Sequence, residues 1–174
     1  MRYAYENIEP DIDESAFVAP SVVLVGKVSL GARSSIWFNS VVRGDINAIT
    51  IGQDTNIQDG CLLHVTSHNP LVIADRVTAG HGAILHGCHI QSDCLIAMGA
   101  IILDGAVVGR GSIVAAGAVV SPGMIIPEES LVMGIPGKVV RSVNADDRAN
   151  IVRGWQNYVG YSDTYRKMGA QPLA

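Results

Sequence analysis

Histidines gather in one short stretch of this sequence, between residues 63 and 87. Four of the chain's five histidines lie there, among aliphatic residues, glycines and small polar residues: His64, His68, His81 and His86. Three imidazoles that leave a fourth coordination position open are a ligand set typical of catalytic zinc. The types and spacing of His64, His81 and His86 therefore raise the hypothesis of a metal centre, provided that the fold lets these side chains meet.

The composition narrows the class of protein. The chain of 174 residues is 48% hydrophobic but only 5% aromatic, with 19 glycines, which favours a thin, regular interior over a core of interlocking rings. A net charge of −4 offers no basic surface for nucleic acid. No apolar run approaches the roughly 20 residues that span a bilayer, and the first residues lack a signal-peptide pattern. We therefore expect a cytoplasmic protein that binds neither nucleic acid nor membranes.

An aliphatic residue recurs at every sixth position in the second half of the chain. The series is Ile90, Ile96, Ile102, Val108, Val114, Val120 and Ile126. A period of six fits neither a helix nor a long amphipathic strand. It is typical of short strands that alternate with tight turns and wind into a parallel β-helix.

The same period extends towards the N-terminus, so the repeats are predicted from about residue 18 to 130. Two insertions interrupt it, near residues 46–49 and 65–72, on either side of the first histidines. Insertions on such a scaffold become loops, often at a functional face. We expect a single structural domain with a β-helix over 1–130, an exit segment over 131–143 and a helix over 144–168 that begins at Asn144 as its N-cap.

The repeat fixes where each histidine lies on the predicted β-helix. His64 and His86 each follow the buried aliphatic of equivalent repeats, so they should stack on one face at about 4.8 Å, the spacing of neighbouring strands. His81 belongs to the adjacent face and cannot turn towards them within its own chain. A neighbouring copy of His81 could, which predicts a cyclic homo-oligomer, most simply a trimer, with a metal at each interface. The alternative is that each histidine packs separately on the surface.

The columns of residues beside these histidines also suggest an interface. Outward positions in them carry apolar residues that would be unusual in water: Val25, Phe38, Met98 and Leu103. Arg43 is one coil from His64, and Asp59 is one coil from His81. If the two faces meet between chains, Arg43 and Asp59 should form an ion pair across the interface.

Several motifs in the sequence resemble one known family. They are WFNSVVRGD at 37–45, IGxxTNIQDG at 51–60, the three histidines and GxPGK at 134–138. Together they resemble the gamma-class carbonic anhydrase-like family of hexapeptide-repeat proteins. The resemblance implies a left-handed parallel β-helix and a homotrimer. It also implies Zn²⁺, with Fe²⁺ or Co²⁺ as alternatives, bound by His64 and His86 of one chain and His81 of another.

The resemblance also suggests roles for other residues. Arg43 and Asp59 match the family's intersubunit ion pair, and Asp45 matches its structural acid. The polar residues beside the metal-bound water and a tyrosine of the C-terminal helix near the metal correspond to Asn56, Gln58 and Tyr158. Ordinary helix packing is the alternative for Tyr158.

The implied reaction is hydration of CO₂ to bicarbonate. A bound zinc ion lowers the pKa of its water to about 7, as is known for carbonic anhydrases, and the hydroxide attacks CO₂. Gln58 would orient the hydroxide and Asn56 would support it. The acids that move protons in the family's prototype are missing, because Ile46 follows Asp45 and 65–72 holds no acid. His68 is a candidate proton shuttle, with a solvated loop histidine as the alternative, so hydration could be weak or the substrate another small molecule.

Two other functions remain open at this point. A hexapeptide acyltransferase would use an interface histidine as a general base and hold no metal. A non-catalytic assembly module would keep the metal only to stabilise the trimer. Metal content and CO₂ hydration distinguish the three.

Overall fold

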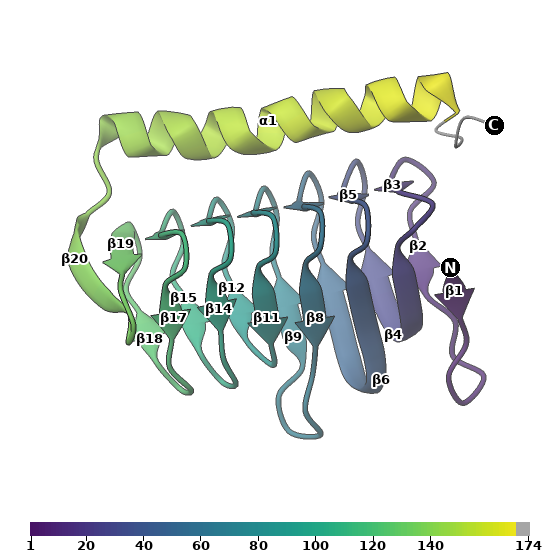
Figure 1. The fold of residues 1–174 in the computed structure, drawn as a ribbon, viewed down its shortest axis with the longest axis horizontal. Helices are drawn as coiled ribbons and strands as arrows, with labels where there is room; N and C mark the ends of the chain where they lie inside the picture. Colours follow the sequence, from purple (N-terminus) through teal and green to yellow (C-terminus); the bar gives the residue numbers. More distant parts are fainter. Residues whose placement is uncertain (170–174) are drawn as a thin grey trace.

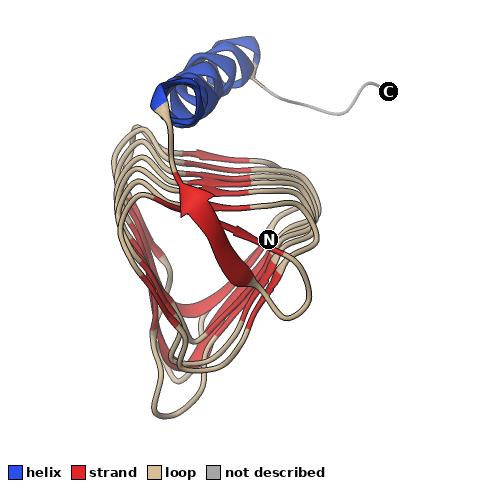
Figure 2. Ribbon diagram, turned by 90° about the vertical axis from the view of Figure 1, so that its left-hand side faces the viewer, coloured by secondary structure: helices blue, strands red, loops and turns tan. Residues whose placement is uncertain are grey.

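The six-residue repeat folds as a parallel β-solenoid with one helix alongside it. The computed structural model describes residues 1–169, and the solenoid makes about 7 turns. Viewed along its axis, the solenoid has a triangular cross-section (Figure 2). The predicted parallel β-helix with a C-terminal helix is therefore confirmed.

The strands form three faces, named here the first, second and third face in chain order. The first face holds β1 (Arg2–Tyr3), the beginnings of β4 (Val23–Leu30) and β6 (Val41–Ile51), β8 (Leu62–His64), β11 (Ile84–His86), β14 (Ile101–Ile102) and β17 (Val119–Val120). The second holds β2 (Asp11–Ile12), the ends of β4 and β6, β9 (Leu71–Ile73), β12 (His89–Ile90), β15 (Val107–Val108) and β18 (Ile125–Ile126). The third holds β3 (Phe17–Val18), β5 (Ser35–Ile36), β7 (Asn56–Ile57), β10 (Thr78–Ala79), β13 (Leu95–Ile96), β16 (Ile113–Val114), β19 (Ser130–Met133) and β20 (Lys138–Ser142).

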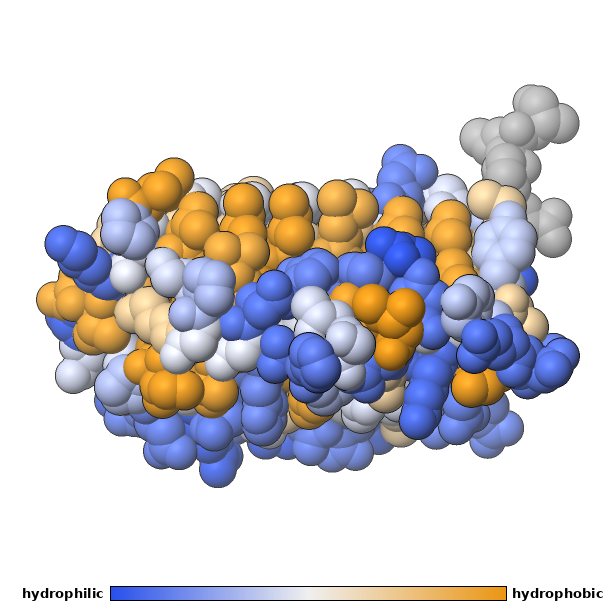
Figure 3. All heavy atoms as spheres, turned by 90° about the horizontal axis from the view of Figure 1, so that it is seen from below, coloured by the Kyte–Doolittle hydropathy of each residue, from blue (hydrophilic) through white to orange (hydrophobic). Residues whose placement is uncertain are grey.

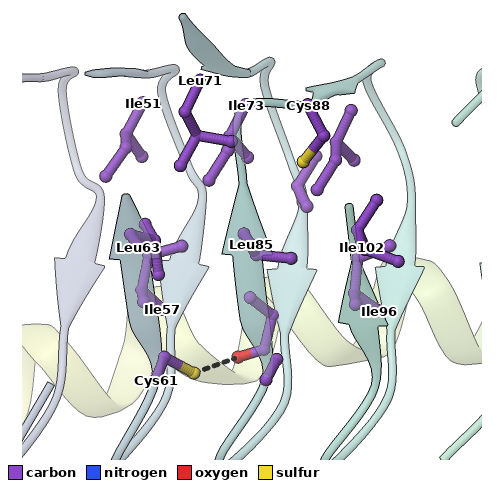
Figure 4. Packing of buried hydrophobic residues seen from close by; sticks show 14 of the residues in the cluster. Ile51, Ile57, Cys61, Leu63, Leu71, Ile73, Leu85, Cys88, Ile96 and Ile102 are labelled. Carbon is purple, nitrogen blue, oxygen red and sulfur yellow. Dashed lines mark hydrogen bonds between the residues drawn. The ribbon is translucent and has the colours of Figure 1, made fainter. Parts of the chain in front are cut away.

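The interior is built from the predicted aliphatic series. Each short strand sends one such side chain inwards, and Leu63, Leu85, Ile96 and Ile102 are at most 1% exposed (Figure 4). Small buried residues fill the corners between the faces: Cys61, Cys94, Ala100, Ala106, Ser112 and Ala118. Because one aliphatic per strand fills a narrow triangle, the chain needs few aromatic rings in this core.

The C-terminal helix begins where the sequence predicts. Helix α1 (Ala145–Met168) has Asn144 as its N-cap, in a capping box in which Asn144 and Asp147 each accept a hydrogen bond from the other's backbone N–H. It lies along the third face (Figure 1). Aromatic packing holds it there, because the rings of Tyr158 and Tyr165 each lie 5.2 Å from that of Trp37. The helix therefore covers the outward side of the third face. Within residues 1–169, no helix is long and apolar enough to cross a membrane.

The solenoid extends beyond the predicted repeats at both ends. β1 and β2 precede residue 18 and pair with β4. At the other end, β19 pairs parallel with β16, and β20 returns antiparallel to β19 inside the segment predicted as an exit. These extra strands supply backbone partners to edges that would otherwise be open.

Two neighbouring isoleucines of β18 test this account of the core. Ile126 is 1% exposed and Ile125 is 65% exposed. We expect Ile126→Ala to lower the free energy of unfolding by about 2–5 kcal/mol, because it leaves a cavity in the core. The matched control Ile125→Ala should change it by no more than about 0.5 kcal/mol. Urea denaturation at fixed protein concentration measures both, and equal losses would contradict the assignment of faces.

Candidate metal centre

His64 and His86 lie side by side on the first face. The register of β6, β8 and β11 aligns Arg43 with His64 and His64 with His86, as the repeat predicts. His64 Nδ1 lies 3.0 Å from His86 Nε2. The two imidazoles thus present one nitrogen each to a common point, although 22 residues separate them in the sequence.

Asp45 anchors His64 from the opposite side of the ring. Its Oδ1 lies 3.1 Å from His64 Nε2, and its other oxygen accepts a hydrogen bond from Arg43. Burial alone would raise the pKa of Asp45, but the hydrogen bonds from Arg43 and His64 outweigh it and hold that pKa below its usual range. The predicted structural acid therefore stays ionised and positions a predicted metal ligand.

Asp104 is a site residue that the sequence did not reveal. Its Oδ1 lies 2.6 Å from His86 Nδ1. Asp104 comes two positions after Ile102, which pairs with Leu85 in the preceding coil. The signal was present in the repeat, since this position is the corner beside His86, but it emerges only when the corner residues of successive coils are aligned. We call Arg43, Asp45, His64, His86 and Asp104 the His64 half-site.

The charged groups of the His64 half-site form a continuous row. Asp45, His64, His86 and Asp104 make three successive contacts. The facing nitrogens of His64 and His86 thus lie between two carboxyl groups, those of Asp45 and Asp104. These two acids would help to balance the charge of a divalent cation bound between the imidazoles.

His81 lies in a different part of the chain's surface, beside Asp59. Asp59 Oδ2 lies 2.9 Å from His81 Nδ1. Both residues sit in turns that follow strands of the third face, and these turns stack coil upon coil, because Gly82 N donates to Asp59 O at 2.9 Å. The same ladder continues to the next coil through Gly99 N and His81 O. The predicted column of Asp59 and His81 is thus present.

Asn56 and Gln58 lie on the third face, close to Asp59 in the same coil. Asn56 is 1% and Gln58 6% exposed. Asn56 Nδ2 donates to Thr78 Oγ1 at 2.9 Å, and Gln58 Nε2 donates to Asn56 Oδ1 at 3.1 Å. This chain of bonds fixes both amide groups and leaves Gln58 Oε1 as an acceptor. Thr78, which sets the orientation of the two amides, was not singled out from the sequence.

Tyr158 reaches the same region from helix α1. With Phe38, Asp59 and Tyr161 it lines a cavity of about 320 Å³ between the helix and the third face. Burial, reinforced by the charge of Asp59, raises the pKa of Tyr158 to about 12. Its hydroxyl therefore stays protonated at neutral pH and can donate a hydrogen bond. We call Asn56, Gln58, Asp59, His81 and Tyr158 the His81 half-site.

One chain does not bring all the predicted site residues together. Within residues 1–169, no group of three or more histidine, cysteine or acidic side chains is placed to hold a metal ion. Arg43 contacts Asp45 and Asp59 contacts His81, so the predicted Arg43–Asp59 pair is not formed inside the chain. His68 is exposed in the 65–70 loop, where its backbone N–H donates to Thr66 Oγ1 at 3.3 Å. The predicted ligands thus divide between two half-sites.

Comparison with known proteins assigns this arrangement to a family. Residues 87–122 match the family model described as bacterial transferase hexapeptide (six repeats). A probable carbonic anhydrase of Methanocaldococcus jannaschii is 50% identical over 88% of this chain and 96% of its own. Gamma carbonic anhydrase 1 of Arabidopsis thaliana mitochondria is 41% identical over 94% of this chain and 62% of its own. The chain belongs to the gamma-class carbonic anhydrase-like family.

A solved structure places this family member within the wider group of hexapeptide-repeat proteins. A protein of Bacillus cereus, provisionally described as an acetyltransferase, superposes with a TM-score of 0.95 at 46% identity. The match covers 97% of this chain and 98% of that one. Both descriptions, carbonic anhydrase and acetyltransferase, therefore occur among close relatives of this gamma-class carbonic anhydrase-like chain.

The His64 half-site of this family member fits a zinc ion by its own geometry. Zinc binds imidazole nitrogen at about 2.0–2.1 Å, so two ligands of a tetrahedral site are about 3.3 Å apart. The 3.0 Å between His64 Nδ1 and His86 Nε2 needs only a small increase to reach that separation. Both rings are also backed by carboxylates, as metal-binding histidines usually are. The half-site supplies two ligands, and a third must come from elsewhere.

Proposed function

We propose that this protein is a metal-dependent carbonic anhydrase of the gamma type, a homotrimer that hydrates CO₂ at sites shared between chains. The observation that carries the proposal is the division of the ligands. His64 and His86 face a common point on the first face, while His81 stands with Asp59 at another corner. Zn²⁺, or Fe²⁺ or Co²⁺ in its place, would be held by His64 and His86 of one chain and His81 of the next.

The surface of the first face supports an assembly of this kind. Its outward positions carry a row of aliphatic side chains along the length of the solenoid, seen near the upper edge of Figure 3. The row contains Leu62, which is 47% exposed, together with Val41, Ile84, Ile101 and Val119. Met98, 58% exposed, lies in the turn that stacks on His81. Apolar area of this extent is typical of a surface that another chain covers.

The residues around the shared site have distinct roles in hydration. A metal held there supplies Lewis-acid activation of water near neutral pH. Gln58 Oε1, fixed by Asn56 and Thr78, accepts a hydrogen bond from the attacking water and so aims its lone pair. Tyr158 keeps its proton and donates a hydrogen bond to an oxygen of the product. The aromatic side of the cavity beside Asp59 gives uncharged CO₂ an apolar approach.

Proton release is the weakest part of the proposed site. Ile46, 53% exposed, stands next to Asp45, where an acid would serve as a relay. The exposed His68 on the neighbouring loop is the candidate that carries protons to solvent. Hydration is therefore expected to be slow without an external buffer and faster when an imidazole buffer replaces the missing relay.

Stopped-flow CO₂ hydration by the zinc, iron, cobalt and metal-free proteins tests the proposal. We expect about one metal per chain, hydration by at least one loaded form and none by the metal-free trimer. Less than about one metal per three chains in intact trimers would refute it. Full loading with no hydration would favour a structural role for the metal.

The Bacillus cereus structure gives a second candidate function, acyl transfer. In that case an interface histidine acts as a general base, and no metal is needed. Transfer from acetyl-coenzyme A by metal-free trimers, measured as thiol release over a panel of amine and hydroxyl acceptors, would support it. We expect no such release.

A further inference from the structure

We infer that Asp104 is a positioning residue that holds His86 in the orientation required to bind the metal. This inference rests on the proposed function and concerns the same site. Asp104 Oδ1 lies 2.6 Å from His86 Nδ1. An ionised carboxylate can only accept, so Nδ1 carries the proton and donates it to Asp104. The lone pair of His86 is then on Nε2, the nitrogen that faces His64.

The backbone at this corner is arranged to let Asp104 reach the imidazole. Gly87 follows His86 and has φ +50, and a Cβ added there would lie 2.7 Å from Asp104 Oδ1. Gly105 N, next to Asp104, donates to Gly87 O at 2.7 Å. Glycine at position 87 therefore both adopts the left-handed turn and leaves the space that the carboxylate fills.

Among the described residues, the Asp104 carboxylate has no partner in the backbone that would explain its position. Within residues 1–169, its side chain accepts a hydrogen bond from His86 alone. Another acid at the same position of the repeat, Asp75, does have a partner in the backbone. Asp75 comes two residues after Ile73, as Asp104 does after Ile102, but its Oδ1 accepts from Gln53 N at 2.9 Å and so secures the backbone. The same position of the repeat thus stabilises the backbone at Asp75, whereas at Asp104 it contacts a histidine side chain.

With this assignment, each histidine of the His64 half-site has a carboxylate of its own behind it. Asp45 holds His64 and Asp104 holds His86, each from the side away from the facing nitrogens. Carboxylates behind metal-binding histidines fix the ring and raise its basicity, and their loss weakens metal affinity 10- to 100-fold. Asp104 is therefore expected to contribute to metal binding without touching the metal.

The test compares Asp104→Asn with the matched control Asp75→Asn in the full-length trimer. Zinc dissociation constants are measured by competition with a chromophoric chelator, and the cobalt forms are compared by their visible absorption. We expect Asp104→Asn to weaken zinc binding about 10- to 100-fold and to alter the cobalt bands, with an unchanged thermal midpoint of the metal-free trimer. Asp75→Asn keeps an oxygen that can accept from Gln53 N, so it should leave both that midpoint and the dissociation constant nearly unchanged.

The possible outcomes separate this inference from the proposed function. If the wild-type trimer binds zinc and Asp104→Asn binds it equally well, the role of Asp104 is refuted while the proposed function stands. If Asp104→Asn weakens zinc binding only as much as Asp75→Asn does, its effect is structural and the inference also fails. If the wild-type trimer binds no metal, both fail together.

Discussion

Chains carrying His81→Ala, assembled together with chains carrying His64→Ala, are expected to regain about a quarter of the metal sites that each variant loses by itself. Each proposed site takes His64 and His86 from one chain and His81 from the next around a closed ring. In a random equal mixture, about one contact in four places a chain with an intact His64 beside a chain with an intact His81. Either variant alone should bind almost no metal, because every one of its sites lacks a ligand.

The control for this experiment is a mixture whose two defects lie in the same half-site. His64 and His86 belong to adjacent strands of one chain, with facing nitrogens 3.0 Å apart. Chains with His64→Ala and chains with His86→Ala should therefore restore no site in any arrangement. Metal per trimer and CO₂ hydration after co-expression and separation of tagged mixed trimers measure both cases. Recovery in the control, or its absence in the first mixture, would exclude the shared site.

Replacement of Gln58 by alanine is expected to lower the hydration rate about 100- to 1,000-fold while the trimer keeps its metal. The physical reason is that Gln58 Oε1 is an oriented acceptor, and loss of one preorganised hydrogen bond in an active site has an effect of this size. Its orientation depends on Asn56, whose amide is in turn fixed by Thr78. Thr78→Val should therefore cause a smaller fall, because it loosens the amides without removing the acceptor.

Gln53 provides a matched control in the same coil. It is an exposed glutamine of the turn that precedes β7, whereas Gln58 is 6% exposed at its end. Gln53→Ala should leave hydration unchanged. Steady-state hydration rates together with metal content distinguish the roles: if Gln58→Ala loses metal in proportion to activity, Gln58 supports the structure of the site and does not take part in the reaction.

The sequence by itself determined the scaffold and the placement of the histidines on it. A single aliphatic at every sixth position defines which side chain points inwards, and each buried member of the series follows from that rule. Once the repeats are aligned, counting residues places His64 beside His86 and puts His81 in a separate column. The start of α1 could be predicted in the same way, because its two capping residues, Asn144 and Asp147, lie within one turn of each other. Period and capping are properties of short segments, so the sequence suffices to predict them.

Only the tertiary structure decided which polar side chains meet. Asp104 contacts His86 across 18 residues at a corner, and Asn56 contacts Thr78 across 22 residues along the third face, each pair joining successive coils. Such contacts depend on turn conformation and on insertions that shift one coil relative to the next, which the period does not specify. Likewise Arg43 contacts Asp45 within the chain, a contact that the sequence did not suggest, while its pairing with Asp59 of another chain stays a prediction. The repeat fixes the direction of each side chain, but its partner depends on distances of a few ångströms that only the folded coils set.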